Sequence, residues 1–324
     1  HVFKPMPEGL SVQGQWHSPS SLKFWADMTF HDLKGRRQVN QTIFDRVFEL
    51  IGNSEKFIFI DMFYFNKFKA DESSRPLSQQ LVDLLIQKKA RFPDIQIRVV
   101  SDPINHVYGS IEADPLAQLQ ASGIEVTYTK LEELPDSNPV WSMLWRPLIR
   151  YFGTGAGETI KNPFTEGHIS IRSAFKLLNF KANHRKTLIV DNADQFTAIV
   201  SSANPHDASW AHDNIAIEFN GPVVIDLLAS ENAVLTMSDA EPVVLKIPAN
   251  QTVETGSVAR MRLVTEGEIR KAALELIDST NPGDQIHLAM FYFSERSIIS
   301  SMIDAIQRGV TVQIILDPNK ESFG

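Results

Sequence analysis

The feature that most restricts the fold is an internal repeat. Met62-Phe-Tyr-Phe65 recurs unchanged as Met290-Phe-Tyr-Phe293, and each copy lies in a short apolar run of strand-forming residues. An amphipathic stretch ending in Glu-Leu-Ile precedes each run, and a second amphipathic stretch follows it. An apolar run leading into Asp-Pro, at Asp102 and at Asp317, then closes each copy. This order predicts two similar α/β halves.

The same alternation predicts how each half is built. Helices that connect strands favour parallel neighbours, so we expect a mostly parallel or mixed sheet with helices on its faces. The expected elements of the two halves are helices at 43–51 and 269–277, strands at 57–65 and 286–293, helices at 77–90 and 297–308, and strands at 95–100 and 310–316. Further strands are expected at 124–128, 187–190, 196–200 and 215–219.

These elements divide the chain into four parts. We expect an N-terminal extension at 1–40, a first half at 41–225, a connector at 226–265, and the start of a second half at 266–324. The first half carries a long insertion at about 131–178, which is rich in aromatic residues and contains a Gly-rich run. A loop this long is usually a lid or binding loop, although an extra subdomain explains it equally well.

The amino-acid composition limits the classes of function that fit this chain. The 324 residues include 31 Lys and Arg against 39 Asp and Glu, a formal net charge of −8, which weighs against a general nucleic-acid binder. The absence of cysteine excludes disulfides, thiolate metal sites and cysteine nucleophiles. No apolar run is long enough to cross a membrane. The first residue is His1, which fits a removed signal or anchor and equally fits simple trimming.

The most informative stretch runs from Asn183 to Asp191. A strand over 187–190 places His184 and Lys186 on one face, two residues apart. A neutral imidazole can attack phosphorus, while a neighbouring ammonium neutralises the non-bridging oxygens and keeps the ring unprotonated. This pair therefore points to chemistry on a phosphate ester.

Residues downstream of this pair complete the predicted site. Ser202 and Asn204, in the turn after the next strand, can donate hydrogen bonds to the same phosphate oxygens. Glu218, on the strand after that turn, can accept a hydrogen bond from the second ring nitrogen of His184 and fix its tautomer.

The spacing His-x-Lys-x4-Asp followed by Ser-x-Asn resembles the signature of the phospholipase D superfamily. The segments Leu177–Lys186 and Ser202–Ser209 are similar to a bacterial group of such proteins that is often membrane-anchored. The resemblance implies two phospholipase D-like halves with the active cleft between them. It also implies metal-free catalysis with no cofactor, through a phosphohistidine.

The same resemblance assigns roles to individual residues. His184 matches the nucleophile, and Lys186 and Asn204 match the phosphate-binding positions. Asp191 matches the motif aspartate, which in the family is mostly a structural partner, and Glu218 resembles the acid that orients the ring. In the family, a second His protonates the leaving oxygen.

The chain departs from the family pattern at this last point, because no second His-x-Lys-x4-Asp occurs in it. A complete site then needs residues beyond Gly324, a second chain or fragment, or a homodimer. The partial second half favours the first two options.

His206, Asp207, His212 and Asp213 form a cluster whose spacing fits no firm metal-ligand template. We therefore expect no metal, and instead place His206, His212 and the basic Arg185 at the rim of the substrate site.

The sequence thus predicts a phosphodiesterase that hydrolyses or transfers a phosphatidyl group, with a phospholipid as the expected substrate. The expected partner is a membrane surface rather than nucleic acid, and the expected location is membrane-associated or exported. The alternatives are a cardiolipin synthase-like phosphatidyltransferase, a phospholipase D-family nuclease and a non-catalytic phosphate-binding protein.

Overall fold

A computed structural model describes residues 4–136, 160–179, 181–193, 195–245 and 259–317. The chain divides into two compact units, which are described separately. Unit 1 comprises residues 1–10 and 15–262, and unit 2 comprises residues 11–14 and 263–324. The aromatic and Gly-rich centre of the predicted insertion lies outside the described residues.

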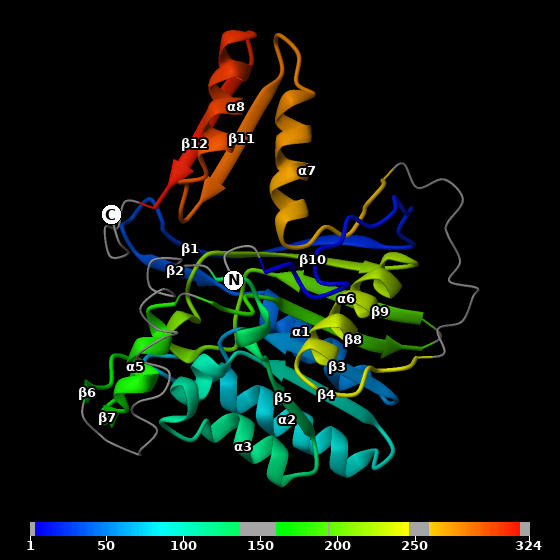
Figure 1. Cartoon of the computed structure of the whole chain (residues 1–324), viewed down its shortest axis with the longest axis vertical. Coiled ribbons are helices and arrows are strands. Elements are labelled where there is room, and N and C mark those ends of the chain that lie inside the picture. Colours follow the sequence, from blue (N-terminus) through cyan, green and yellow to red (C-terminus); the bar gives the residue numbers. More distant parts are fainter. Residues whose placement is uncertain (1–3, 137–159, 180, 194, 246–258, 318–324) are drawn as a thin grey trace. The chain divides into compact units, whose positions relative to one another are not determined.

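Unit 1 is built on an eight-stranded sheet in the order β2-β1-β10-β9-β8-β3-β4-β5 (Figure 1). The strands are β1 (Leu22–His31), β2 (Arg37–Asn40), β3 (Phe57–Met62), β4 (Gln96–Ser101), β5 (Glu125–Tyr128), β8 (Lys186–Asn192), β9 (Gln195–Ser201) and β10 (Asn214–Asn220). Only the neighbours β3, β4 and β5 run parallel, and the other pairs are antiparallel. The predicted mixed α/β fold is confirmed, but most neighbouring strands of the sheet are antiparallel.

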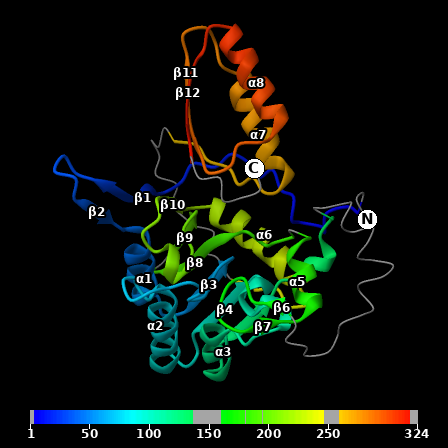
Figure 2. The ribbon, with the colours of Figure 1, turned by 90° about the vertical axis from the view of Figure 1, so that its left-hand side faces the viewer.

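Helices cover both faces of this sheet (Figures 1 and 2). Leu188 and Val190 of β8 join the core under α1 (Ile43–Asn53), α2 (Leu77–Arg91) and α3 (Asp114–Ala121). Thr187, which points to the opposite face, donates a hydrogen bond to Glu231 of α6 (Val223–Met237). The β8 strand is therefore buried from both sides, which fits the uninterrupted apolar run at 188–190 in its centre.

Smaller elements complete unit 1. They are α5 (Ile171–Leu177), the hairpin of β6 (Ile160–Lys161) and β7 (His168–Ile169), and the 3₁₀ segments Pro103–Gly109, Leu131–Glu133 and Asp207–Ser209. None of the helices in the described part of the chain combines the length and apolar character needed to cross a membrane.

Part of the predicted N-terminal extension supplies two strands of the sheet. β1 pairs with β10, and β2 pairs with β1. Buried Asp27 of β1 also accepts hydrogen bonds from the backbone amides of Thr42 and Ile43, at 2.7 and 2.9 Å. These amides have no partner within α1, so Asp27 caps the start of that helix from a neighbouring strand.

Unit 2 contains α7 (Gly267–Asp278), β11 (Gln285–Met290), α8 (Arg296–Gln307) and β12 (Thr311–Leu316). The β11 and β12 strands run parallel, as β3 and β4 do. The register agrees at equivalent positions, since Phe57 pairs with Gln96 and Gln285 pairs with Thr311. Element order and register therefore both repeat, as the sequence predicts for this part of the two halves.

Candidate functional site

The His184–Lys186 pair lies where β8 begins and the antiparallel β3 ends. Ligands of open α/β sheets usually bind at the carboxyl ends of the parallel strands, and β3 ends here. His184 is exposed, whereas Lys186 is only 5% exposed. The Lys186 ammonium donates to the backbone carbonyl of His184 at 2.9 Å and lies 3.3 Å from the ring Nδ1. The two side chains thus meet as the sequence predicts.

Aromatic rings pack against the His184–Lys186 pair. The centroid of the Phe63 ring lies 4.4 Å from the centroid of the His184 ring and 5.1 Å from the Lys186 ammonium. The ring of Tyr64 lies 4.2 Å from Phe63 and 5.2 Å from His206. Phe63 also donates its backbone amide to the Arg185 carbonyl, which ties the end of β3 to the His184 loop. The first copy of the repeated tetrapeptide therefore forms the floor of the site.

Burial and charge set the protonation of the pair. Although part of His184 is exposed, its ring packs against Phe63 and loses contact with water there. This desolvation, and then the neighbouring Lys186 charge, lower the pKa of His184 to about 4. Burial lowers the pKa of Lys186 to about 8, although the charges of Asp61 and Asp102 oppose that change. At neutral pH the ring is therefore neutral and able to act as a nucleophile, while the ammonium still carries most of its charge.

The carboxyl group of Asp102 holds the loop that carries His184. It is fully buried and accepts hydrogen bonds from the backbone amides of Ile104 and Asn183, each at 2.8 Å. Burial raises the pKa of Asp102 to about 7, against the hydrogen bonds and the Lys186 charge. The sequence showed Asp102 only as part of the repeat, and its position at a strand end of the sheet was the available signal.

A second buried carboxyl group, Asp61, binds the side chain of the same asparagine. Asn183 donates to its two oxygens at 2.9 and 2.8 Å. Burial, and then the charge of Glu231, raise the pKa of Asp61 well above its usual value. A buried carboxyl group next to a second acidic side chain keeps its proton more readily than an exposed one. Asp61 and Asp102 together fix Asn183, the residue that precedes His184.

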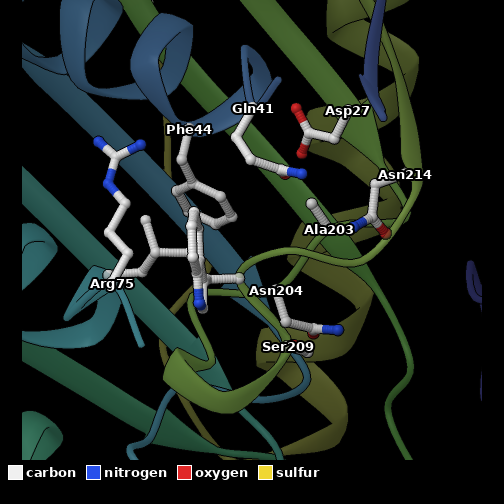
Figure 3. Close-up of a pocket in the computed structure, with 10 residues that line it drawn as sticks. Asp27, Gln41, Phe44, Arg75, Ala203, Asn204, Ser209 and Asn214 are labelled. Atoms are coloured by element: carbon white, nitrogen blue, oxygen red, sulfur yellow. The ribbon is translucent and has the colours of Figure 1, made fainter. Parts of the chain in front are cut away.

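The two phosphate-binding candidates after β9 are placed differently. Asn204 accepts a hydrogen bond from the Tyr64 backbone amide at 3.0 Å, which brings it beside the aromatic floor. It also lines a pocket with Phe44 and Arg75 (Figure 3). Ser202 is exposed, and its hydroxyl is used in the turn, where it donates to Asn214 and accepts from the Ile215 amide.

Asp191 lies at the opposite end of β8 from His184. It accepts hydrogen bonds from the Ser54 hydroxyl and from the backbone amides of Glu55, Lys56 and Phe57. Burial disfavours its charge, but these hydrogen bonds outweigh burial and lower its pKa. Asp191 therefore anchors the connection between α1 and β3, and no contact joins it to the His184 ring in the described structure.

Glu218 is not beside the His184 ring, which corrects the orienting role expected for it. Its carboxylate accepts from Arg46 at 2.7 and 2.9 Å and from the Trp25 indole at 2.8 Å. Burial opposes its charge, yet these donors lower its pKa. Glu218 lies opposite Ile199, and Ile199 lies opposite Leu188, so Glu218 is two strands away and further along the sheet.

The three predicted rim residues do not form one rim. Arg185 is largely buried, with its guanidinium 3.4 Å from Glu231. Both ring nitrogens of His206 are engaged, with Ser209 and with the Phe68 carbonyl, each at 3.0 Å. His212 is exposed in the turn before β10. Over the described ranges, no group of three or more His, Asp or Glu side chains is placed to hold a metal ion.

Comparison with known proteins identifies the fold. The family model described as "Cardiolipin synthase, PLD-like domain" matches residues 273–324. The structure of phosphatidylserine synthase from Haemophilus influenzae Rd KW20 is similar, with a TM-score of 0.51 and 13% identity, covering 96% of this chain and 67% of that one. A search of curated proteins found no match.

Two other solved structures are more distant. Polyphosphate kinase from Porphyromonas gingivalis has a TM-score of 0.43 and 13% identity over 90% of this chain and 37% of that one. Nuc, a phospholipase D family member from Salmonella typhimurium, has a TM-score of 0.33 and 14% identity over 65% and 90%. A likeness at these two scores is too weak to bear on the function of this chain.

The family match within unit 2 and the similar fold both support the resemblance to the phospholipase D superfamily that the sequence motif indicates. Members of this superfamily are phosphodiesterases or phosphatidyltransferases.

Proposed function

We propose that this protein cleaves a phosphodiester through a phosphohistidine formed on His184. The observation that carries the proposal is the contact between an exposed, neutral imidazole and the buried Lys186 ammonium at the end of β3. A neutral ring is a nucleophile, and a buried cation stabilises negative charge on phosphate more strongly than an exposed one.

The proposed reaction has two steps. In the first, the Nε2 lone pair of His184 attacks phosphorus, an N–P bond forms, and the P–O bond to the leaving alcohol breaks. In the second, water or an alcohol attacks the phosphohistidine, the N–P bond breaks, and a new P–O bond forms. The leaving oxygen gains a proton in the first step, and the attacking oxygen loses one in the second.

The contact between the two side chains sets one requirement for this reaction. An ammonium only donates, so its contact with Nδ1 leaves the ring proton on Nε2. Attack through Nε2 therefore requires Lys186 to turn from the ring to the incoming phosphate, whose oxygens are stronger acceptors. We assign Lys186 and Asn204 to hold the phosphate, and we give Ser202 the supporting role of shaping the turn.

The proton for the leaving alcohol needs a second acid. The chain contains one His-x-Lys-x4-Asp motif, so we assign the acid to a histidine outside these 324 residues, in a C-terminal segment or in a second chain. An alcohol leaves poorly as an alkoxide, and this acid is therefore required for a natural substrate.

A phospholipid is the proposed substrate, and the proposed working location is a membrane surface. The acidic net charge of −8 favours this over nucleic acid, and the matched family is described as cardiolipin synthase-like. That description also favours a second candidate, the transfer of a phosphatidyl group to an alcohol. Added glycerol or phosphatidylglycerol separates the two, because transfer gives a new phosphodiester and hydrolysis gives phosphatidic acid.

Bis(p-nitrophenyl) phosphate tests the proposal because its leaving group departs without an acid. We expect this compound to lose one p-nitrophenolate and to leave its p-nitrophenyl phosphoryl group on the His184 peptide, detected by mass spectrometry after quenching at alkaline pH. His184→Asn should remove the label, whereas His287→Asn, a control on exposed β11, should keep it. A label on another residue, or none, contradicts the assignment of His184.

A further inference from the structure

The hairpin of β1 and β2 carries apolar side chains on a face that the rest of unit 1 leaves exposed. Alternation along β1 puts Phe24, Met28 and Phe30 on one side, where they are 63%, 52% and 47% exposed. Leu33, in the turn between the two strands, is fully exposed. Figure 2 shows the hairpin, in dark blue, extending past α1 and α2. A contiguous apolar face of this kind usually marks a binding surface.

Hydrogen bonds hold the turn in one conformation, and this conformation keeps Leu33 exposed. Asp32 accepts from the backbone amides of Lys34 and Arg36, each at 2.9 Å, and from the Arg36 guanidinium at 2.8 Å. The Gly35 amide donates to the Asp32 carbonyl, and Gly35 has a φ of +74°, which a glycine adopts without strain. The apolar tip is thus presented on a rigid support.

The charge of the hairpin is opposite to that of the chain. Residues 22–40 contain four Lys or Arg against two Asp, while the whole chain has a net charge of −8. Asp27, one of the two acids, is buried as the α1 cap, and Asp32 is occupied by Arg36. Lys34 and Arg37 therefore set a positive charge beside the Leu33 tip, on an otherwise acidic molecule.

We infer that the β1–β2 hairpin docks on an anionic phospholipid surface. Leu33 enters the interface, while Phe24, Met28 and Phe30 rest on the acyl boundary. The basic side chains meet the lipid phosphates, and apolar burial together with this attraction gives the binding energy. The net negative charge of the remaining chain is repelled by the same lipids, which turns the hairpin toward the membrane.

Vesicle sedimentation of the whole protein tests this inference without requiring turnover. We expect binding to phosphatidylcholine vesicles that contain phosphatidylglycerol, weaker binding to phosphatidylcholine alone, and weakening by salt. Leu33→Ser should reduce binding about tenfold. Arg37→Gln should reduce it about fivefold on the anionic vesicles and leave it unchanged on neutral ones.

Matched controls keep the test specific. Leu276→Ser changes another exposed leucine, on α7, and Arg91→Gln removes another exposed charge, at the end of α2, so both should bind as the wild type does. Equal binding by Leu33→Ser and wild type overturns the inference. So does a dimeric mass that Leu33→Ser abolishes without any vesicle binding, because the face would then be a protein interface.

A failure of this inference can be distinguished from a failure of the proposed function. The nitrophenyl phosphodiester is soluble, so Leu33→Ser should still label at His184. Loss of labelling with retained vesicle binding would contradict only the proposed chemistry.

Discussion

The two copies of the strand–helix–strand repeat share their sequence pattern and register but differ in surroundings. Every residue of β3 is buried, whereas most of β11 is exposed. Phe63 is 8% exposed, and its counterpart Phe291 is 62% exposed. In unit 1, β8 pairs with the free edge of β3 and α6 covers one face, but among the described residues β11 pairs with β12 alone.

This difference shows that the first copy of the repeat packs against the candidate pair, His184 and Lys186, which the beginning of β8 supplies. Phe63 becomes part of a site because the β8 strand places His184 and Lys186 against its ring. Asp102 acts on the His184 loop for the same reason. The same residue types in unit 2, at Phe291 and Asp317, have no such loop in the described structure.

The largest expected effect is on the cleavage rate, which should depend on His184 of unit 1 and not on His287 of unit 2. His184→Ala and His184→Asn should each lower the rate of bis(p-nitrophenyl) phosphate cleavage at least about 10³-fold, because each removes the nucleophile. His184→Asn should leave the fold intact, as judged by circular dichroism, because the residue is exposed. His287→Asn, on β11, should keep the wild-type rate. Activity retained by either His184 variant would rule out this nucleophile.

The next contrast concerns stability. Phe63→Ala should lower the free energy of unfolding of unit 1 by about 3–5 kcal/mol, because it empties a buried space. Phe291→Ala should change stability by less than about 1 kcal/mol, because this ring is exposed. All tryptophans lie outside unit 2, so their fluorescence in a denaturant titration reports unit 1, and circular dichroism reports both. An equal loss in the free energy of unfolding for the two variants would mean that the two copies are equally buried.

A smaller effect is expected in the pH dependence of stability. Burial raises the pKa of Asp102 to about 7, so the folded state holds this proton more tightly than the unfolded state, whose pKa is about 3.9. The stabilisation is complete below about pH 4 and is lost as pH rises through about 7. Asp102→Asn should flatten the fall in stability of unit 1, and Asp317→Asn, at the counterpart position, should not. An unchanged slope in Asp102→Asn would contradict the assignment.

The smallest effect is expected at alkaline pH. Burial lowers the pKa of Lys186 to about 8, so the ammonium is lost above that pH and phosphate binding weakens. The cleavage rate should fall by about tenfold between neutrality and about pH 9. Lys186→Arg, if it folds, should keep its charge and remove this fall. A rate that stays constant in wild type up to about pH 10 would show that Lys186 titrates elsewhere.

Much of the fold was predictable because hydrophobic periodicity is local. The strands at 95–100, 187–190 and 196–200 correspond to β4, β8 and β9 within two residues at each end, and the helix at 77–90 corresponds to α2. The strand expected at 57–65 ends earlier, at Met62, where the chain turns into the floor of the site. β1 was not predicted, because it exposes Phe24, Met28 and Phe30 and lacks the outward polar alternation of an ordinary strand.

The candidate site was also predictable only where its residues are close together in the sequence. A spacing of two residues at the beginning of a predicted strand was enough to place His184 beside Lys186. Glu218 was misplaced because its distance from His184 depends on the register of three strands, which no local pattern gives. Asp61 and Asp102 come from two neighbouring strands and meet only at Asn183, so their joint role depended on the pairing of β3, β4 and β8.

The sequence by itself determined the repeat, the helices and strands around it, and the presence of a histidine–lysine pair suited to phosphate. Each of these rests on neighbours within a few residues along the chain. Only the tertiary structure decided which copy of the repeat became the floor of a site, which carboxyl groups hold His184, and that Glu218 binds Arg46 instead. Burial shifts pKa values and fixes hydrogen bonds according to what lies across the sheet, and that depends on strand order and register.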